Sequence, residues 1–598
     1  MSSYQLDNIK PGEQNVTTSV NFDVDNAANG LSNRAKTTER LELNRIKDEE
    51  TIARFGKKQQ LKVSTILAQL THRNNNAILN ILQRRFKSLS AVGLTCGLML
   101  TWEVILFTLQ FGLQNGGPAG LIYGFLAAWC GASLQAVVMA EMASMIPLAG
   151  GPFNWVAILS PPWCRKFLSY LAGWLTVISW QAFVAEVCYT CASLIQGLII
   201  LNYEDYDPKL WQATLLFYAI ALFGVFINTY LGRLLPRIEA LMLILYIVGF
   251  FAVLIPVAYL SPHTSAKKVF TVFQNLGGWD SMGLSFFVGW ITSVSSFVGN
   301  DGADHIAEEI SQATKVIPFS IWFSTIFNGV LGFSMLLAVL FGVQDIVAAT
   351  ESATGFPFME IFVGSLGSTA ANALVSFQPH STQTRRVGAI LVGIIVITVV
   401  NVFSVSSVMA TASRTLWAFS RENGLSYSKF LVKVRTTMTQ HYDTGADIVD
   451  PNTRLPINAI LVTLVINVLL ALISIGSLTA FGAFYSVVLA AYQSSFLLAA
   501  SVMLRKRLST PTSEIPWGPF QLKRLGVPIT ILAIIYTILA LFFSFWPAFA
   551  QVDAATMNWS CLIFGGALIF SMVFWVLYGR KVYVGPIWEF DGQFVRMN

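Results

Sequence analysis

The chain has 598 residues, of which 54% are hydrophobic and only 12% are charged, about half the charged fraction of an ordinary soluble domain. A soluble protein of this length would divide into several cores, and each core would need a charged surface. The composition therefore excludes a soluble globular protein and indicates that most of the chain faces lipid.

The N-terminal segment, residues 1–85, is polar. It contains no apolar run long enough to cross a bilayer, and the opening MSSYQLDNIKPGEQNVTT lacks the apolar core of a signal peptide. We expect a disordered tail in the cytosol. Some of its lysines are candidate sites for ubiquitin, with an unmodified solvated tail as the alternative. These are Lys10, Lys36, Lys47, Lys57, Lys58 and Lys62.

Long charge-free stretches begin at about Leu89. A helix needs roughly 20 apolar residues to cross a bilayer, so the pattern predicts about twelve transmembrane helices in a polytopic domain over residues 86–580. A short cytosolic tail follows over residues 581–598. The stretch 455–504 is long enough for two helices, with a break near Gly476. The predicted spans are 89–113, 119–141, 167–200, 211–231, 238–260, 282–306, 318–342, 387–412, 456–475, 478–503, 526–548 and 558–579.

The positions of lysine and arginine predict the orientation. Cytosolic loops of membrane proteins carry the excess of these residues, so both termini are predicted to be cytosolic. The same distribution accounts for the net charge of +6, and nucleic acid is not expected as a partner. With the tail inside, only five of the 38 basic residues lie outside: Lys209, Lys267, Lys268, Arg385 and Arg386.

Three classes of membrane protein fit such a chain: a secondary transporter, a membrane-embedded enzyme, and a channel or receptor. An ATP-driven pump would need a GxxxxGK[ST] phosphate loop, which the sequence lacks. An enzyme would need a cluster of nucleophiles, bases or metal ligands, whereas the five histidines are scattered and no HExxH occurs. We therefore expect no catalytic residue, metal site or cofactor, and favour a carrier driven by an ion gradient.

The carboxylates of Glu103, Glu186 and Asp301 fall within predicted helices that contain no lysine or arginine. An acidic side chain in the membrane costs about 2.5–3.5 kcal/mol on insertion scales and by default faces a cavity. Each is therefore a candidate for holding a cationic substrate or carrying a coupling proton. Hydrogen bonding to a neighbouring helix is the structural alternative.

Two predicted helices contain breaks. Gly299-Asn300-Asp301-Gly302 places two glycines and two turn-forming residues within the sixth span, and unwound backbone at that depth is tolerated only where it lines a cavity. The first helix has a weaker counterpart between Gly93 and Glu103, although Gly93 and Gly97 also fit GxxxG packing. Two broken helices five spans apart are typical of inverted five-helix repeats.

Four motifs occur in a fixed order relative to the twelve spans. They are Asn115–Gly120 (NGGPAG) after the first, Ala140–Trp155 (AEMASMIPLAGGPFNW) after the second, Ser296–His305 (SFVGNDGADH) with Ala307–Glu309 (AEE) in the sixth, and Ser413–Gly424 (SRTLWAFSRENG) after the eighth. With these motifs the chain resembles the amino acid-polyamine-organocation transporter superfamily over about residues 85–580. It is most similar to the fungal branch that contains choline, GABA and amino-acid permeases.

The resemblance implies an all-α membrane fold of two inverted five-helix repeats plus two helices. The substrate would lie between the discontinuous helices 1 and 6, flanked by helices 3, 8 and 10. The Glu141 segment and Arg414–Arg421 would be cytosolic loops that steer helix movement, with plain anchoring at a helix end as the alternative. The implied substrate-binding residues are Gly97, Thr101 and Trp102 in helix 1, and Ser296, Phe297, Asn300 and Asp301 in helix 6.

The residues around the first helix favour an ammonium substrate. Amino-acid carriers of this superfamily often hold a carboxylate on free N–H groups of a tight Gly-x-Gly, whereas Gly93 and Gly97 are spaced more widely. Trp102 stands where choline-type members carry tryptophan, and an aromatic face attracts quaternary ammonium groups. Glu103, particular to this chain, adds negative charge beside it and joins the candidate site. An amino acid such as GABA also satisfies this pattern.

The sequence therefore predicts a plasma-membrane permease that takes up a small nitrogen-containing solute by proton symport and alternating access. Asp301, Glu103 and Glu186 are the candidate coupling residues. The alternatives are a polyamine carrier, a vacuolar amino-acid carrier, and a nutrient receptor that keeps the fold without transporting.

Overall fold

The computed structural model describes residues 88–203, 205–351, 354–359, 361–362, 382–433, 435–436, 454–476, 480–554, 556–586, 588–590 and 593–595. The predicted N-terminal tail with its candidate lysines lies outside the described residues, as do parts of the predicted C-terminal tail.

All twelve predicted spans are helical in the structure. Within the described residues, ten helices are long and apolar enough to cross a membrane, and two shorter apolar helices, Met282–Ser295 and Ile457–Ile473, take the places of the sixth and ninth spans. This confirms the all-α membrane fold. The main helices are α4 (Ser88–Met99), α5 (Thr101–Phe107), α6 (Leu109–Gln114), α7 (Gly117–Met145), α8 (Pro152–Leu159), α9 (Arg165–Asn202), α10 (Leu210–Tyr230), α11 (Leu235–Leu260), α13 (Met282–Ser295), α14 (Ala313–Gly342), α17 (Thr382–Arg421), α19 (Ile457–Gly476), α20 (Ala480–Ser509), α21 (Gly526–Phe543) and α22 (Ser560–Phe574).

Short elements complete the described chain. Two strand pairs are antiparallel, β1 with β2 and β3 with β4. Helix α22 continues as a π-helical turn, η6. The short elements are α12 (Ala266–Thr271), η2 (Asp304–Glu309), α15 (Ile346–Thr350), α18 (Ser428–Leu431), β1 (Arg435–Thr436), β2 (Arg454–Leu455), η4 (Thr512–Glu514), η5 (Lys523–Leu525), η6 (Trp575–Gly579), α23 (Arg580–Val582), β3 (Trp588–Phe590) and β4 (Gln593–Val595).

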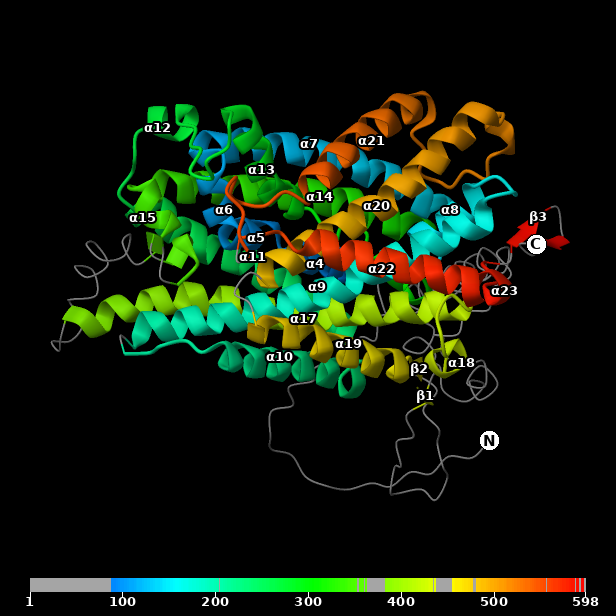
Figure 1. The fold of residues 1–598 in the computed structure, drawn as a ribbon, viewed down its shortest axis with the longest axis horizontal. Helices are drawn as coiled ribbons and strands as arrows, with labels where there is room; N and C mark the ends of the chain where they lie inside the picture. The colour runs from blue at the N-terminus through cyan, green and yellow to red at the C-terminus, as the bar shows by residue number, and fades with distance from the viewer. Residues whose placement is uncertain are drawn as a thin grey trace, which may run out of the picture.

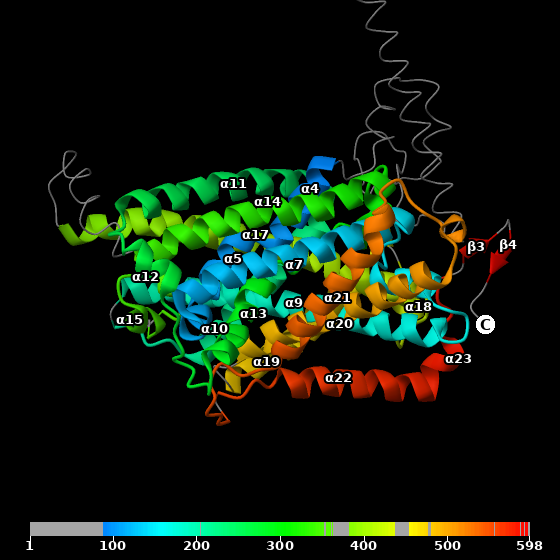
Figure 2. The same cartoon turned by 90° about the horizontal axis from the view of Figure 1, so that it is seen from above.

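The long helices lie side by side, so the bundle has two ends (Figure 1). One end carries α12 and α15 and is called here the α15 end; the other carries α18 and α23 and is called the α18 end. Seen from above, α11 and α22 lie on opposite flanks of the bundle (Figure 2). Inside it, α7 packs along α14, and α9 packs along both α17 and α20.

The distribution of apolar side chains fits a bundle in lipid. Helix α4 is buried from Ala91 to Met99. By contrast, Leu562 and Leu577 near the ends of the last span are 66% and 71% exposed. A helix that is apolar all round is stable only inside a protein or against lipid. Helix α4 is therefore central, and α22 lies at the lipid-facing surface.

Two expectations about the α18 end are wrong. Glu141 lies within α7, and Arg414–Arg421 forms the last two turns of α17, so neither segment is a loop. Helix α17 continues past the predicted end at residue 412 because Arg414 is buried against a carboxylate, Glu309, at 2.5 Å. A charged residue with such a partner does not have to mark the end of a buried helix.

Candidate functional site

The first transmembrane helix is broken at Leu100. Helix α4 ends before this residue and α5 begins after it, and Leu100 has left-handed dihedrals of φ 43° and ψ 38°. The first N–H groups of a helix have no partner within the helix. Tyr246 of α11 packs beside the break, with its ring centroid 5.7 Å from that of Trp102, and its hydroxyl donates to Asn328 Oδ1 at 2.5 Å. The side chain of Tyr246 therefore lies at the start of α5.

The sixth transmembrane helix is broken over the predicted residues. Helix α13 ends at Ser295, η2 begins at Asp304, and Gly299 between them has a φ of 89°. Side chains from two other helices hold the unwound segment at Asn300. The hydroxyl of Tyr492 on α20 donates to Asn300 Oδ1 at 2.5 Å, and Asn300 Nδ2 donates to Thr325 Oγ1 on α14 at 3.4 Å.

The two breaks contact each other directly. The Thr101 hydroxyl at the start of α5 donates to the backbone carbonyl of Ser296 at 2.7 Å. Leu98 of α4 packs against Gly302, where an added Cβ would lie 2.0 Å from Leu98 Cδ1. Two discontinuous helices in contact at their breaks form the usual frame of a binding site in secondary carriers.

A small cavity of about 20 Å³ lies beside the breaks, which is room for about one water molecule. Helices α4, α5, α9, α13 and α20 contribute to it. Its polar groups are Ser295, Tyr485 and one carboxylate, Glu186 of α9. The apolar remainder of the lining is Met99, Val104, Phe183, Val298, Val488 and Leu489.

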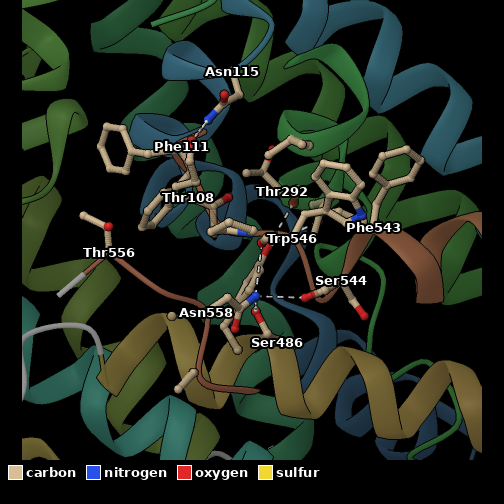
Figure 3. A pocket seen from close by; sticks show the side chains of 18 of the residues that line it. Thr108, Phe111, Asn115, Thr292, Ser486, Phe543, Ser544, Trp546, Thr556 and Asn558 are labelled. Atoms are coloured by element: carbon tan, nitrogen blue, oxygen red, sulfur yellow. Dashed lines mark hydrogen bonds between the residues drawn. The ribbon is translucent and has the colours of Figure 1, made fainter. Parts of the chain in front are cut away.

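A larger pocket of about 310 Å³ lies toward the α15 end (Figure 3). The connections α6–α7 and α21–α22 line it, together with α13 and α20. We call it the vestibule. Asn558 donates from Nδ2 to Ser486 Oγ and to the carbonyls of Ser544 and Trp546, each at 3.1 Å (Figure 3). Among the described residues, no charged side chain lines the vestibule. Its lining includes the aromatic and neutral polar side chains Phe111, Phe543, Trp546, Phe549, Asn115 and Thr292.

Tyr485 of α20 lines both the vestibule and the small cavity. Its hydroxyl is hydrogen-bonded to Ser295 Oγ, and it lies 3.4 Å from the carbonyl oxygens of Ile291 and Thr292. The side chain thus ties helix 10 to helix 6 where the two spaces adjoin. In this conformation it separates the vestibule from Glu186.

Acidic side chains predominate around the breaks. Five carboxylates lie in the interior here, and none forms an ion pair with lysine or arginine among the described residues. Glu103 accepts a hydrogen bond from Asn401 Nδ2, and Glu239 accepts one from Ser407 Oγ at 2.8 Å. Buried ionised carboxylates need a cation or a bound proton, so this interior suits a cationic solute or protons. Of the five, Glu103, Glu239, Asp301 and Asp304 are buried, and Glu186 is half-buried.

Some predicted site residues lie away from the cavity. Trp102 is fully buried, with its ring centroid 5.7 Å from Tyr246 and 6.0 Å from Phe250, both on α11. It lines neither the vestibule nor the small cavity. Gly97 faces Glu239, whose Oε2 lies 4.0 Å from the position of an added Cβ. The glycines of α4 therefore allow it to pack closely on α11, as in GxxxG contacts.

The remaining predicted residues meet at the break of helix 6. Ser296 accepts the bond from Thr101, and Phe297 packs on Phe125 of α7 with ring centroids 5.3 Å apart. Asp301 Oδ2 lies 3.1 Å from His305 Nε2. The structure thus brings Thr101, Ser296, Asn300 and Asp301 together at the two breaks, but none of these four residues lines the small cavity that contains Glu186.

Ion pairs hold the α18 end together. Each joins a carboxylate near the end of a membrane span to an arginine of a helix far away in the chain, and the side chains involved are at most 10% exposed. Glu141 Oε1 also accepts the backbone N–H of Leu522 at 2.7 Å. The pairs are Glu309 with Arg414 at 2.5 Å, Glu308 with Arg421 at 2.5 Å, and Glu141 with Arg507.

Several residues of this site were missed by the sequence analysis. Glu239 follows Arg237 closely and resembles a charged helix end, although it is fully buried. Tyr485 is one of 17 tyrosines, and no local pattern distinguishes it. For Asp304 and His305 a signal was present, because positions three and four after Asp301 share its face in a helical turn.

Comparison with known proteins agrees with this geometry. Residues 86–568 match the model of a family described as amino acid permease. A choline transporter of Saccharomyces cerevisiae is 28% identical over 502 residues, covering 84% of this chain and 82% of the relative. A putative amino acid/polyamine transporter of Macrophomina phaseolina is 28% identical over 472 residues, covering 78% and 96%. Amino-acid permease 2 of Neurospora crassa is 24% identical over 512 residues, covering 85% and 87%.

Proposed function

This chain belongs to the amino acid permease family, and from that premise we propose that it is a proton-coupled carrier for a small solute with an ammonium group. The family and the relatives make it a multi-pass membrane transporter for amino acids or amines rather than an enzyme. The observation that carries the finer proposal is the position of Glu186 in the cavity beside both helix breaks.

Glu186 is the group that would bind the ammonium. It is the carboxylate of the small cavity, and no lysine or arginine competes for it there. A solute would reach it through the vestibule, whose aromatic walls attract ammonium groups by cation–π interaction. The cavity holds about one water in this conformation, so movement of Tyr485 has to enlarge it when the solute enters.

The break of helix 1 supports an amine more than an α-amino acid. A substrate carboxylate would need free N–H groups at a helix start, and the aromatic side chain of Tyr246 packs on Trp102 at the start of α5. The choline transporter of Saccharomyces cerevisiae is among the relatives, which supports the same choice. A choline-like amine is therefore the substrate class that we propose first.

We further propose that the α15 end faces outside and that both termini are cytosolic in the plasma membrane. The basic residues Lys267 and Lys268 of α12 are among the few at the α15 end, as the positive-inside rule requires of an outer surface. The vestibule at the α15 end and the ion pairs at the α18 end correspond to the outward-facing step of alternating access.

Uptake measurements in cells lacking their own permeases test the proposal. Radiolabelled choline, GABA, arginine, leucine and spermidine would be compared, and choline is expected to accumulate. Glu186→Gln should raise the KM for choline about 10- to 100-fold, because the quaternary ammonium loses its charge partner and a close charge pair contributes about 1.5 kcal/mol or more. Glu514→Gln is the matched control, since this carboxylate lies on the exposed turn η4. An unchanged KM in Glu186→Gln would contradict the assignment.

The coupling ion is tested in the same cells. An inward proton gradient should drive accumulation, and Asp301→Asn should weaken that drive. Uptake that needs sodium and ignores the pH gradient would contradict proton coupling. Unchanged transport by Asp301→Asn at every pH would leave Asp301 with a structural role.

A further inference from the structure

Three ionisable side chains lie within little more than one turn of helix 6, outside the lining of the small cavity: Asp301, Asp304 and His305. Their exposed fractions are 2%, 0% and 0%. His305 Nε2 lies 2.9 Å from the indole nitrogen of Trp180 on α9 and 3.1 Å from Asp301 Oδ2. Two groups from different helices therefore compete for one nitrogen atom.

The contacts of His305 Nε2 with Trp180 and with Asp301 cannot both be hydrogen bonds at the same time. An indole N–H can only donate, so the contact with Trp180 requires an Nε2 lone pair, and the ring proton then sits on Nδ1. A proton on Nε2 would instead be donated to Asp301 and would face the indole N–H. A proton on Nε2 thus breaks the bond of His305 to Trp180 on α9 and leaves its bond to Asp301 in helix 6.

The surroundings favour a bound proton. Asp301 Oδ1, both Asp304 carboxylate oxygens and His305 Nδ1 are buried without a hydrogen-bond partner. Neither aspartate pairs with a lysine or arginine among the described residues. Buried carboxylates without a cation are costly unless they share a proton. In the described part of the chain, no three His, Cys, Asp or Glu side chains are placed to hold a metal ion instead.

The neighbouring elements leave His305 as the group that can respond. Helix α20 presents Tyr492, which is bonded to Asn300. Helix α14 presents Thr325 and α4 presents Leu98, neither of which titrates. The start of α8 presents the backbone of Gly151, which does not titrate. Helix α17 presents two cations, Arg414 and Arg421, and these are bonded to the carboxylates of Glu309 and Glu308 respectively.

We propose that His305 Nε2 binds the coupling proton and that Trp180 links its occupancy to helix 3. The proposal deepens the proposed function and rests on it. Without the proton, the Trp180 bond ties α9 to η2. A proton taken from water forms an N–H bond at the lone pair, its charge is shared with Asp301, and Trp180 loses its acceptor. Loss of the proton to water on the other side restores the bond. Trp180 and Glu186 lie on the same helix, so the proton site is connected to the proposed ammonium site.

Transport of radiolabelled choline by the purified protein in liposomes tests this site. Two activities are compared: accumulation driven by an inward proton gradient, and choline–choline exchange at equal pH. His305→Gln keeps an acceptor for Trp180 but cannot take a proton, so accumulation should fall at least about tenfold while exchange stays within about twofold of wild type. His263→Gln is the matched control, because that histidine is on a surface connection.

A second variant, Trp180→Phe, removes the competing donor. The pH of half-maximal uptake should rise by up to about one unit, the equivalent of one neutral hydrogen bond. A purely structural role would lower transport without moving this midpoint. Gradient-driven accumulation at the wild-type level in His305→Gln, loss of exchange together with accumulation, or an unmoved midpoint in Trp180→Phe would each overturn the proposal.

A fluorescence titration keeps the test independent of the solute. A protonated imidazole quenches a neighbouring indole, and the rings of Trp180 and His305 lie 5.2 Å apart. Wild-type protein should show an acid-induced quench that both His305→Gln and Trp180→Phe lack. If wild type neither accumulates nor exchanges choline, the proposed function fails. Absence of this quench in wild type overturns the proton site itself.

Discussion

The hydroxyl of Thr101 donates a 2.7 Å hydrogen bond to the carbonyl oxygen of Ser296. These residues stand at the breaks of two helices that are five spans apart in the chain, and the bond joins the start of α5 to the residue after α13. A carbonyl at a helix end has no partner in its own helix. The Thr101 side chain supplies that partner and holds the two discontinuous helices in register.

Replacing Thr101 by valine should therefore loosen this contact. We expect Thr101→Val to lower the free energy of unfolding by about 1–3 kcal/mol, the cost of leaving a buried acceptor unpaired, and to slow solute exchange. Thermal unfolding in detergent and exchange in liposomes measure the two effects. Thr95→Val is the control, because the Thr95 hydroxyl bonds within its own helix to Ala91. Equal losses in both variants would contradict a special role for Thr101.

Removing the hydroxyl of Tyr485 should open the passage between the vestibule and the small cavity. Tyr485→Phe keeps the ring but loses the bonds to Ser295 and the nearby α13 carbonyls. We expect choline exchange to become several-fold faster with a lower KM, because the closed conformation that excludes the solute loses about 0.5–1.5 kcal/mol per hydrogen bond. Tyr123→Phe, which affects an exposed hydroxyl bonded to Phe270, should behave as wild type. Slower exchange with an unchanged KM would show that the hydroxyl does not restrain the passage.

Breaking one ion pair at the α18 end should favour the inward-facing conformation. Glu309 and Arg414 are 2% and 1% exposed, and removing one partner of a buried pair costs about 3–5 kcal/mol. Glu309→Gln should therefore lower the unfolding temperature and expose the α18 end to water-soluble thiol reagents at an introduced cysteine. The double variant Glu309→Gln with Arg414→Met should recover much of the stability, since no unpaired charge remains.

An exposed ion pair provides the matched control for this experiment. Lys209 and Asp207 are 56% and 74% exposed, and exposed pairs contribute about 0–1 kcal/mol. Asp207→Asn should leave the unfolding temperature nearly unchanged. A double variant at Glu309 and Arg414 that is less stable than either single variant would refute the pairing argument.

The close approach of the two breaks predicts a compensating pair of substitutions. A Cβ at Gly302 would lie 2.0 Å from Leu98 Cδ1, so Gly302→Ala should destabilise the protein by about 1–3 kcal/mol through overpacking. Adding Leu98→Ala makes room for the methyl group, and the double variant should be more stable than the sum of the single effects predicts. Gly565→Ala, where an added Cβ meets no atom within 4 Å, is the control. Strict additivity at Leu98 and Gly302 would contradict this contact.

The sequence by itself determined where the membrane spans lie along the chain and the place of one break. Charge-free stretches of about 20 residues are a local requirement of the bilayer, and all twelve predicted spans are helices. The segment Gly299-Asn300-Asp301-Gly302 identified the break of helix 6 because its turn residues are also a local property. The break at Leu100 was harder to locate, since a leucine in a left-handed conformation has no signature in the sequence.

Only the tertiary structure decided which side chains meet at the site. Hydropathy cannot tell lipid-facing from bundle-facing positions on a helix that is apolar all round. It therefore could not show that Trp102 packs on α11 while Glu186 faces the cavity. The contacts of His305 with Trp180 and of Glu309 with Arg414 join residues more than a hundred positions apart. Such contacts depend on how whole helices pack, and no local pattern in the chain encodes them.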